Sequence, residues 1–223
     1  MTTLPGAFAP LAQRLAARVP VVAGDDDGVR QWAAVAAIVR ASSVTDALEL
    51  LLIRRPEKSS DPWSGHIALP GGRQDARDVD LTATAVRETF EEVGIDLARH
   101  GTVLGALDDL APRNPALPPI IVRPFVAVLR DNVPVTPNHE VAAHYWVSLA
   151  QLAAPESVAE HVVQVRAGPG GNVPTAFATD ATDTGGVRAR FPAYRVGDAV
   201  IWGLTERVVR QLLSLTEQHT GAT

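Results

Sequence analysis

The sequence predicts an α/β fold, because strand-like and helix-like patterns alternate along the chain. The segment from Trp32 to Arg40 is almost entirely Ala, Val and Ile, which is typical of a buried strand. Within the later stretch from Leu69 to Ile95, apolar residues repeat at helical spacing, at Ala83, Val86, Phe90 and Val93. Strands and helices in this arrangement predict helices packed against a sheet.

The composition indicates a globular protein and excludes several kinds of site and partner. The chain has 223 residues and is 46% hydrophobic, which is enough for one sizeable core. It has no cysteine, which excludes disulfides, thiolate zinc sites and a cysteine nucleophile. Its net charge of −5 offers no basic surface to nucleic acid or to an anionic membrane. Because no apolar run reaches the roughly 18–20 residues of a membrane span and no signal-peptide pattern is present, we expect a soluble, cytoplasmic protein.

The first expected element is an N-terminal amphipathic helix. Pro10 suits a first helical position and Pro20 ends the pattern. The apolar residues that define its buried face are Phe8, Leu11, Leu15 and Val19. We therefore expect an added helix within residues 1–30, before a main domain at 31–218.

The remaining elements follow in order. After the strand at 32–40, a turn at 41–46 leads to a strand at 47–54, and further strands are expected at 102–108, 120–130 and 145–147. Pro124 favours an edge strand or a bulge, and Ser148 is expected to cap a short helix. The glycine-rich and threonine-rich parts of 156–190 predict only turns or a mobile hairpin. A strand pair at 191–202 and a C-terminal helix at 204–215 complete the chain.

Three carboxylates, those of Glu88, Glu91 and Glu92, lie at positions that share one face of the helix expected before Gly94. Like charges at this spacing cost an isolated helix roughly 0.2–0.5 kcal/mol per pair. A hard divalent cation would remove that cost, since Mg²⁺ prefers oxygen ligands. The alternative is a solvated acidic face, with the apolar residues buried on the opposite side.

The flanking residues favour the metal site. Gly71 and Gly72 follow Pro70 in a turn that lets the backbone approach a ligand closely. Asp78 and Asp80 are candidate N-caps of the helix, and Gly94 stands where a C-cap requires positive φ.

This stretch resembles the box motif of the Nudix hydrolase family. The second half of the motif is matched in register by Arg87, Glu88, Glu91, Glu92, Gly94 and Ile95. Thr89 replaces the usual apolar residue. After Gly72 and five intervening residues the chain has Asp78 in place of glutamate, and eight rather than seven residues then precede Arg87. The resemblance implies an α/β/α sandwich around a mixed sheet, with the N-terminal and C-terminal helices added.

The resemblance also implies a chemistry and roles for residues. Mg²⁺ or Mn²⁺ would be held by Glu88, Glu91 and Glu92, and Arg87 would hold these glutamates in position. Asp78 would replace the first glutamate of the box. The implied reaction is cleavage of a diphosphate bond in a small molecule that carries a nucleoside diphosphate.

Other residues are candidates for the same site. Gly71 and Gly72 would bring backbone amides to it, and Glu140, in the loop after the helix, would act as general base or further ligand. The alternative for Glu140 is an ordinary surface glutamate. Arg54 and Arg55 are candidate phosphate contacts, with ordinary strand-end charge as the alternative.

The spacing of Asp75, Asp78 and Asp80 after the glycine pair is similar to that of the coenzyme A pyrophosphatase branch of the family, which makes coenzyme A or acyl-CoA the expected substrate. One departure from that branch is Asp61, which stands where its signature has arginine. The alternatives are a broad pyrophosphatase for ADP-ribose, nucleotide sugars or damaged nucleoside triphosphates, and a nucleotide-sensing domain without activity. A homodimer is the assembly considered.

Nearby ring side chains have simpler expected roles. Trp63 could stack on a base, although packing within its loop is the favoured interpretation. His66 is expected to be a structural hydrogen-bonding residue.

Overall fold

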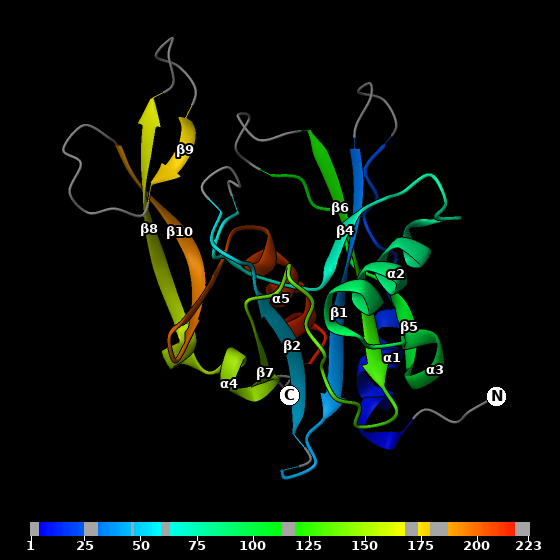
Figure 1. The fold of residues 1–223 in the computed structure, drawn as a ribbon. Coiled ribbons are helices and arrows are strands. Elements are labelled where there is room, and N and C mark those ends of the chain that lie inside the picture. The colour runs from blue at the N-terminus through cyan, green and yellow to red at the C-terminus, as the bar shows by residue number, and fades with distance from the viewer. Residues whose placement is uncertain are drawn as a thin grey trace.

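The computed structural model describes residues 5–24, 31–45, 47–58, 63–112, 119–167, 174–178 and 187–216. Its strands form two sheets, a seven-stranded main sheet and a four-stranded second sheet (Figure 1). The helices pack mainly against the main sheet, which carries the candidate site.

The main sheet is mixed, with the strand order β3-β2-β1-β6-β5 and with β4 and β7 paired to β1 and β2. Its central pair, β1 and β6, is parallel, and its other pairs are antiparallel. The strands are β1 (Gln31–Ala41), β2 (Leu48–Arg54), β3 (Ile67–Ala68), β4 (Gly71–Arg73), β5 (Gly101–Ala106), β6 (Ile120–Leu129) and β7 (Ala143–Ser148). The strands expected near 32–40, 47–54, 102–108, 120–130 and 145–147 are all confirmed.

Helices cover both faces of this sheet. They are α1 (Ala9–Ala16), α2 (Leu81–Val93), α3 (Leu97–His100), α4 (Leu149–Ala153) and α5 (Gly203–Ser214), with short 3-10 turns at Gly6–Phe8 and Pro155–Ser157. Because side chains alternate along β1, Ala37 and Val39 join a core with α1, α4 and α5, while Ala36 and Ile38 join a core with α2 and α3. The expected α/β/α sandwich is confirmed.

The N-terminal helix packs into the first of these cores through Phe8, Leu11 and Leu15, all of which are buried. The prediction for Val19 is wrong, because its side chain is 89% exposed. The reason is that α1 ends at Ala16, so the helical spacing no longer applies at Val19. The division of the chain at residue 30 stays a prediction.

Two further details differ from the expectations. Pro124 lies in β6, which is an internal strand, and the irregular register is in the neighbouring strand β5, between Val103 and Gly105. On the β5 side the regular ladder ends at Ala106, and Pro124 still takes part in the sheet through its carbonyl, because Leu107 N donates to Pro124 O at 2.8 Å. Ser148 precedes α4 as expected, but its side chain makes no capping hydrogen bond.

The second sheet was not predicted. Its order is β11-β10-β8-β9, built from β8 (Val158–Ala167), β9 (Pro174–Ala178), β10 (Val187–Val196) and β11 (Ala199–Trp202). The sequence predicted its β10–β11 hairpin, and for the region of β8 and β9 it predicted no more than turns or a mobile hairpin. Figure 1 shows β8 and β10 on the β2 side of the main sheet. The turns predicted at 168–171 and 179–186 fall outside the described residues.

Candidate functional site

The site is built on α2, whose two ends are fixed by the residues expected there. The N-cap is Asp80, whose Oδ1 accepts a hydrogen bond from Ala83 N at 2.7 Å. The C-cap is Gly94, with φ of 70°, and its N–H donates to Phe90 O. Asp78, the other candidate cap, has a different role, described below.

The orientation of α2 differs from the prediction. Phe90 was expected on the buried face, but it is 58% exposed, whereas Glu92 is only 3% exposed. The buried face consists of Thr84, Ala85, Thr89, Glu92 and Val93. The carboxylate side of the helix therefore faces the protein, and the interpretation as a solvated acidic face is wrong for Glu92.

Small side chains make this orientation favourable. Ala85 and Thr89 are buried, and Thr89 Oγ1 donates to Ala85 O at 2.7 Å, which satisfies its hydroxyl within the helix. Thr89 thus fills a position at which the family has an apolar residue without leaving a buried donor unpaired. A close approach between α2 and β4 follows.

Glu92 is the most deeply placed of the three glutamates. Its Oε2 accepts a hydrogen bond from Gly71 N at 2.9 Å. The pKa of Glu92 is raised from its ordinary 4.5 to about 7, mainly by burial and also by the nearby charges of Glu88 and Glu140, which outweigh the lowering effects of the Gly71 hydrogen bond and of Arg55. This carboxylate would gain most from a cation.

Gly71 and Gly72 permit the contact between β4 and α2. Gly71 has φ of 152°, and a Cβ there would lie 2.3 Å from Ala34 O. A Cβ on Gly72 would lie 2.5 Å from the carboxylate of Glu88. Any larger residue at either position would displace β4 or the glutamates.

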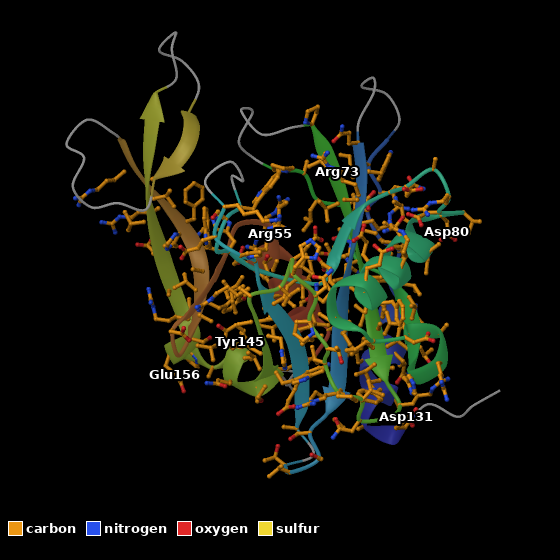
Figure 2. All side chains as sticks on the ribbon, in the orientation of Figure 1. Arg55, Arg73, Asp80, Asp131, Tyr145 and Glu156 are labelled. Carbon is orange, nitrogen blue, oxygen red and sulfur yellow. The ribbon has the colours of Figure 1, made fainter. Side chains whose placement is uncertain are left out.

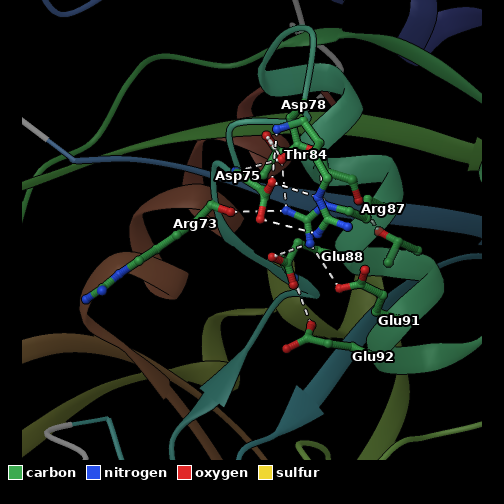
Figure 3. Close-up of polar contacts among 12 residues, drawn as sticks. Arg73, Asp75, Asp78, Thr84, Arg87, Glu88, Glu91 and Glu92 are labelled. Atoms are coloured by element: carbon green, nitrogen blue, oxygen red, sulfur yellow. Dashed lines mark hydrogen bonds and ion pairs between the residues drawn. The ribbon is translucent and has the colours of Figure 1, made fainter.

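Arg87 connects the carboxylates of this site (Figure 3). Its Nη1 donates to Glu88 Oε1 and to Glu91 Oε2, each at 2.9 Å. Its Nε and Nη2 form two parallel bonds with the carboxylate of Asp78, each at 2.9 Å. Burial raises the pKa of Glu88, while the Arg87 bond opposes that shift.

Asp78 is fixed by further donors. Its Oδ2 also accepts hydrogen bonds from Thr84 Oγ1 and from Asp75 N, each at 2.9 Å. The Arg87 guanidinium is the main cause that holds the pKa of Asp78 well below its usual range. Asp78 is therefore a firmly ionised anchor for Arg87.

The donor set suits a hard divalent ion in its chemistry, since it offers three carboxylates and no softer ligand. Within the described residues, no three acidic or histidine side chains are already arranged to hold a metal. The reason is that Arg87 engages Glu88 and Glu91 while Gly71 engages Glu92. Glu91, with a side chain 50% exposed, has the room to change its rotamer toward an ion.

The loop after β6 borders the same site. Its backbone is hydrogen-bonded to the end of α2, where Thr136 N donates to Val93 O and Asn138 N donates to Glu92 O. Glu140 N in turn donates to Asn138 Oδ1 at 2.7 Å, and the Glu140 charge acts on both Glu88 and Glu92. Asn138 was missed as a positioning residue, although an Asn two residues before a candidate acid is a known turn signal.

The two arginines at the end of β2 have different surroundings. Arg54 Nη2 lies 2.9 Å from Asp198 Oδ2, in the β10–β11 turn, and its guanidinium lies 5.5 Å from the ring centroid of Tyr145. This arrangement favours a structural ion pair for Arg54. Arg55, labelled in Figure 2, acts electrostatically on Glu92 and stays a predicted phosphate contact.

The loop before β3 brings rings together. His66 N donates to Trp63 O, and the His66 ring lies 4.8 Å from the Trp202 ring. The sequence predicted a structural hydrogen-bonding role for the His66 side chain, which stays a prediction, and the structure adds the contact of its ring with Trp202. Asp61, the departure from the coenzyme A signature, lies outside the described residues. In the described part of the chain, no helix combines the length and the apolar character that crossing a membrane requires.

Comparisons with known proteins identify the domain to which these residues belong. The model of the NUDIX domain matches residues 30–166. An uncharacterized Nudix hydrolase, NudL, of Photorhabdus laumondii is 30% identical over 163 residues, which span 73% of this chain and 74% of that protein. An uncharacterized protein of Schizosaccharomyces pombe is 39% identical over 121 residues, or 51% of this chain, but the match spans only 36% of the yeast protein.

A solved structure extends the comparison to the fold. A MutT/nudix family protein from Enterococcus faecalis superposes with a TM-score of 0.52 at 14% identity, covering 94% of this chain and 68% of that one. At this identity the likeness concerns the fold alone. The match of the domain model over residues 30–166, together with the similarity to NudL, shows that this chain belongs to the Nudix family.

Proposed function

We propose that this protein hydrolyses the diphosphate bond of a small molecule that carries a nucleoside diphosphate, with Mg²⁺ or Mn²⁺ held by Glu88, Glu91 and Glu92. The observation that carries the proposal is Glu92, a buried carboxylate with its pKa raised to about 7 beside two other glutamates. Burying such a group costs stability, and a cation offsets that cost. When bound, the metal polarises phosphoryl oxygens and makes an attacking water more acidic.

The residues of this chain would divide the work. Arg87, fixed by Asp78, orients Glu88 and Glu91 toward the site. Gly71 N fixes Glu92, and the lack of side chains at Gly71 and Gly72 leaves the β4 backbone next to the carboxylates. Glu140, whose side chain is half exposed and whose charge acts on Glu88 and Glu92, would accept a proton.

For the substrate we propose coenzyme A or acyl-CoA, on the spacing of Asp75, Asp78 and Asp80 after the glycine pair. Arg55 is the proposed phosphate contact, since its charge acts on Glu92. The location that we propose is the cytoplasm, and a homodimer remains the assembly considered.

The specific observation in favour of a second substrate is Asp61 at the position where the coenzyme A signature has arginine. A carboxylate there would repel the phosphate of coenzyme A. ADP-ribose, a nucleotide sugar or a damaged nucleoside triphosphate is then the alternative. A sensor without activity is a poorer fit, because all three box glutamates are present.

A panel of substrates tests the proposal. Coenzyme A, ADP-ribose, a nucleotide sugar and nucleoside triphosphates are incubated with Mg²⁺, with Mn²⁺ and with chelator, and the released products are quantified. We expect metal-dependent turnover, with the largest kcat/KM for coenzyme A. Equal or faster turnover of ADP-ribose would remove the coenzyme A assignment, and full activity in chelator would remove the metal mechanism.

A further inference from the structure

A cluster of four aromatic side chains lies where the second sheet meets the main sheet. Trp202 is its centre, and the ring centroids of His161, His66 and Phe191 lie 4.7, 4.8 and 5.6 Å from it. The three rings are tilted to Trp202 by 42–57°. All four side chains are partly exposed, so the cluster is not closed off as a core.

The members of this ring cluster come from both sheets. His66 precedes β3 of the main sheet, whereas His161, Phe191 and Trp202 belong to β8, β10 and β11. Two other contacts fix the same junction: Thr205 Oγ1 donates to Ile67 O at 3.0 Å, and Arg54 pairs with Asp198. Phe191 and Trp202 lie beyond residue 166, where the family model ends.

Short backbone steps connect the ring cluster to the carboxylate site. Arg55 N donates to His66 O at 3.0 Å, and the charge of Arg55 acts on Glu92. From His66 the chain runs through β3 to Gly71, which contacts Glu92 directly. A ligand with its phosphates at the glutamates would thus have the ring cluster within reach of its remaining part.

We propose that the ring cluster binds the base of the substrate, as a stacking surface for a purine linked to the diphosphate. The proposal rests on the proposed function and names the group of the substrate that the second sheet would recognise. Aromatic side chains stack on the faces of bases, and this stacking depends little on which hydrogen-bonding groups the base carries. Burial and Arg195 lower the pKa of His161, so near neutral pH its ring is a neutral aromatic surface.

Two other tryptophans are less suited to this role. The guanidinium of Arg40 covers the ring of Trp146 at 4.0 Å, and that of Arg123 lies 5.4 Å from the ring of Trp32. Arg123 is held there by Asp109, at 2.7 Å. Trp32 does line an open hollow of about 380 Å³, beside Val22 and Arg123, which makes it the rival position for a base.

The first test uses the unaltered protein and no catalysis. Affinities for adenosine 5′-monophosphate and ribose 5-phosphate are measured by calorimetry in chelator. We expect the monophosphate to bind about 5- to 100-fold more tightly, the range for stacking of one base. Equal affinities would mean that the base adds nothing and would overturn the proposal.

The second test locates the base. His161→Ala should remove most of the preference for the monophosphate and leave ribose 5-phosphate unchanged, whereas His161→Phe should retain the preference because it keeps a ring. The matched control is His100→Ala, which removes a partly exposed imidazole that pairs with Asp131, away from the ring cluster. If Trp32→Ala abolishes the preference and His161→Ala does not, the base binds in the hollow and the proposal is wrong.

A third variant covers the case in which His161→Ala does not fold. Phe191→Ala, on the neighbouring strand, should lower affinity for the monophosphate in the same way, and unchanged affinity would contradict the proposal. These readouts are independent of hydrolysis. If the protein hydrolyses the panel but binds the monophosphate no more tightly than ribose 5-phosphate, only the proposal for the ring cluster is wrong. If it shows the binding preference but hydrolyses nothing, only the proposed function is wrong.

Discussion

Asp78 and Glu92 are two carboxylates of one site that differ in almost everything except burial. The side chain of Asp78 is 5% exposed, and residue Glu92 is 3% exposed. Asp78 accepts two bonds from Arg87 and further bonds from Thr84 and Asp75, and its pKa is lowered. Glu92 accepts a bond from Gly71 N and is surrounded by like charge, and its pKa is raised.

The difference teaches which carboxylate supports the structure and which one performs the chemistry. A buried charge with several donors stabilises the fold, whereas a buried charge with few donors destabilises it until a ligand supplies the missing charge. Asp78 therefore reads as a positioning residue and Glu92 as a residue poised for a cation. Substitutions that remove each charge should have opposite effects on stability.

The largest effect is expected from Glu92→Gln. Turnover should fall by about 100- to 1,000-fold, as when one group that stabilises transition-state charge is lost. The amide can still accept from Gly71 N, so the metal-free protein should become more stable above pH 7. Glu91→Gln should also lower turnover strongly, but without the gain in stability, because Glu91 is half exposed. Near-normal turnover in both variants would refute the metal assignment.

A smaller loss of turnover is expected from Glu140→Gln. If Glu140 is the proton acceptor, turnover should fall by about 100-fold, the lower limit for general base catalysis, with the affinity for Mn²⁺ unchanged. Removing this charge should also lower the pKa of Glu92, since Glu140 contributes to raising it. Steady-state rates measure the turnover, and Mn²⁺ titrations measure the affinity for the metal. An unaltered rate would mean that Glu140 is an ordinary surface glutamate.

Asp78→Asn should act on stability rather than directly on chemistry. It removes the charge that Arg87 binds twice, and we expect a loss of about 2 kcal/mol in the free energy of unfolding, the size of hydrogen bonds to a charged group. Urea unfolding of the metal-free protein measures it. The matched control is Asp75→Asn, whose pair with the largely exposed Arg77 should contribute little. Equal losses of stability in the two variants would contradict the claim that the bonds between Asp78 and Arg87 stabilise the fold more than the exposed pair of Asp75 and Arg77.

The smallest and most discriminating effect is the pH dependence of these stability changes, measured in chelator. The folded pKa of Glu92 lies above its ordinary 4.5, so the penalty relieved by Glu92→Gln should be absent below about pH 4.5 and grow as the pH rises through about 7. The folded pKa of Asp78 lies below its ordinary 3.8, so the deficit of Asp78→Asn should be complete above that pH and shrink as the pH falls. If the stability changes of the two variants vary with pH in the same way, the contrast between Asp78 and Glu92 is wrong.

The sequence by itself determined the position of α2, both of its capping residues and the grouping of Glu88, Glu91 and Glu92, because these depend on helical spacing and on local capping chemistry. It also predicted the longer strands of the main sheet, whose runs of Ala, Val, Ile and Leu need no distant partner to be recognised, but not the short strands β3 and β4, where the sequence indicated a loop and a turn. The family resemblance extended these local patterns to a complete sandwich.

Only the tertiary structure decided which side of α2 is buried. The hydrophobic pattern favoured burial of Phe90, but the glycines of β4 allow α2 to pack through Ala85 and Thr89, which buries Glu92 in its place. Tertiary packing also formed the second sheet, in which β8 and β9 carry little strand signal of their own although the sequence predicted turns nearby. Burial and partners are properties of the assembled fold, and for that reason the opposite pKa shifts of Asp78 and Glu92 have no counterpart in the sequence pattern.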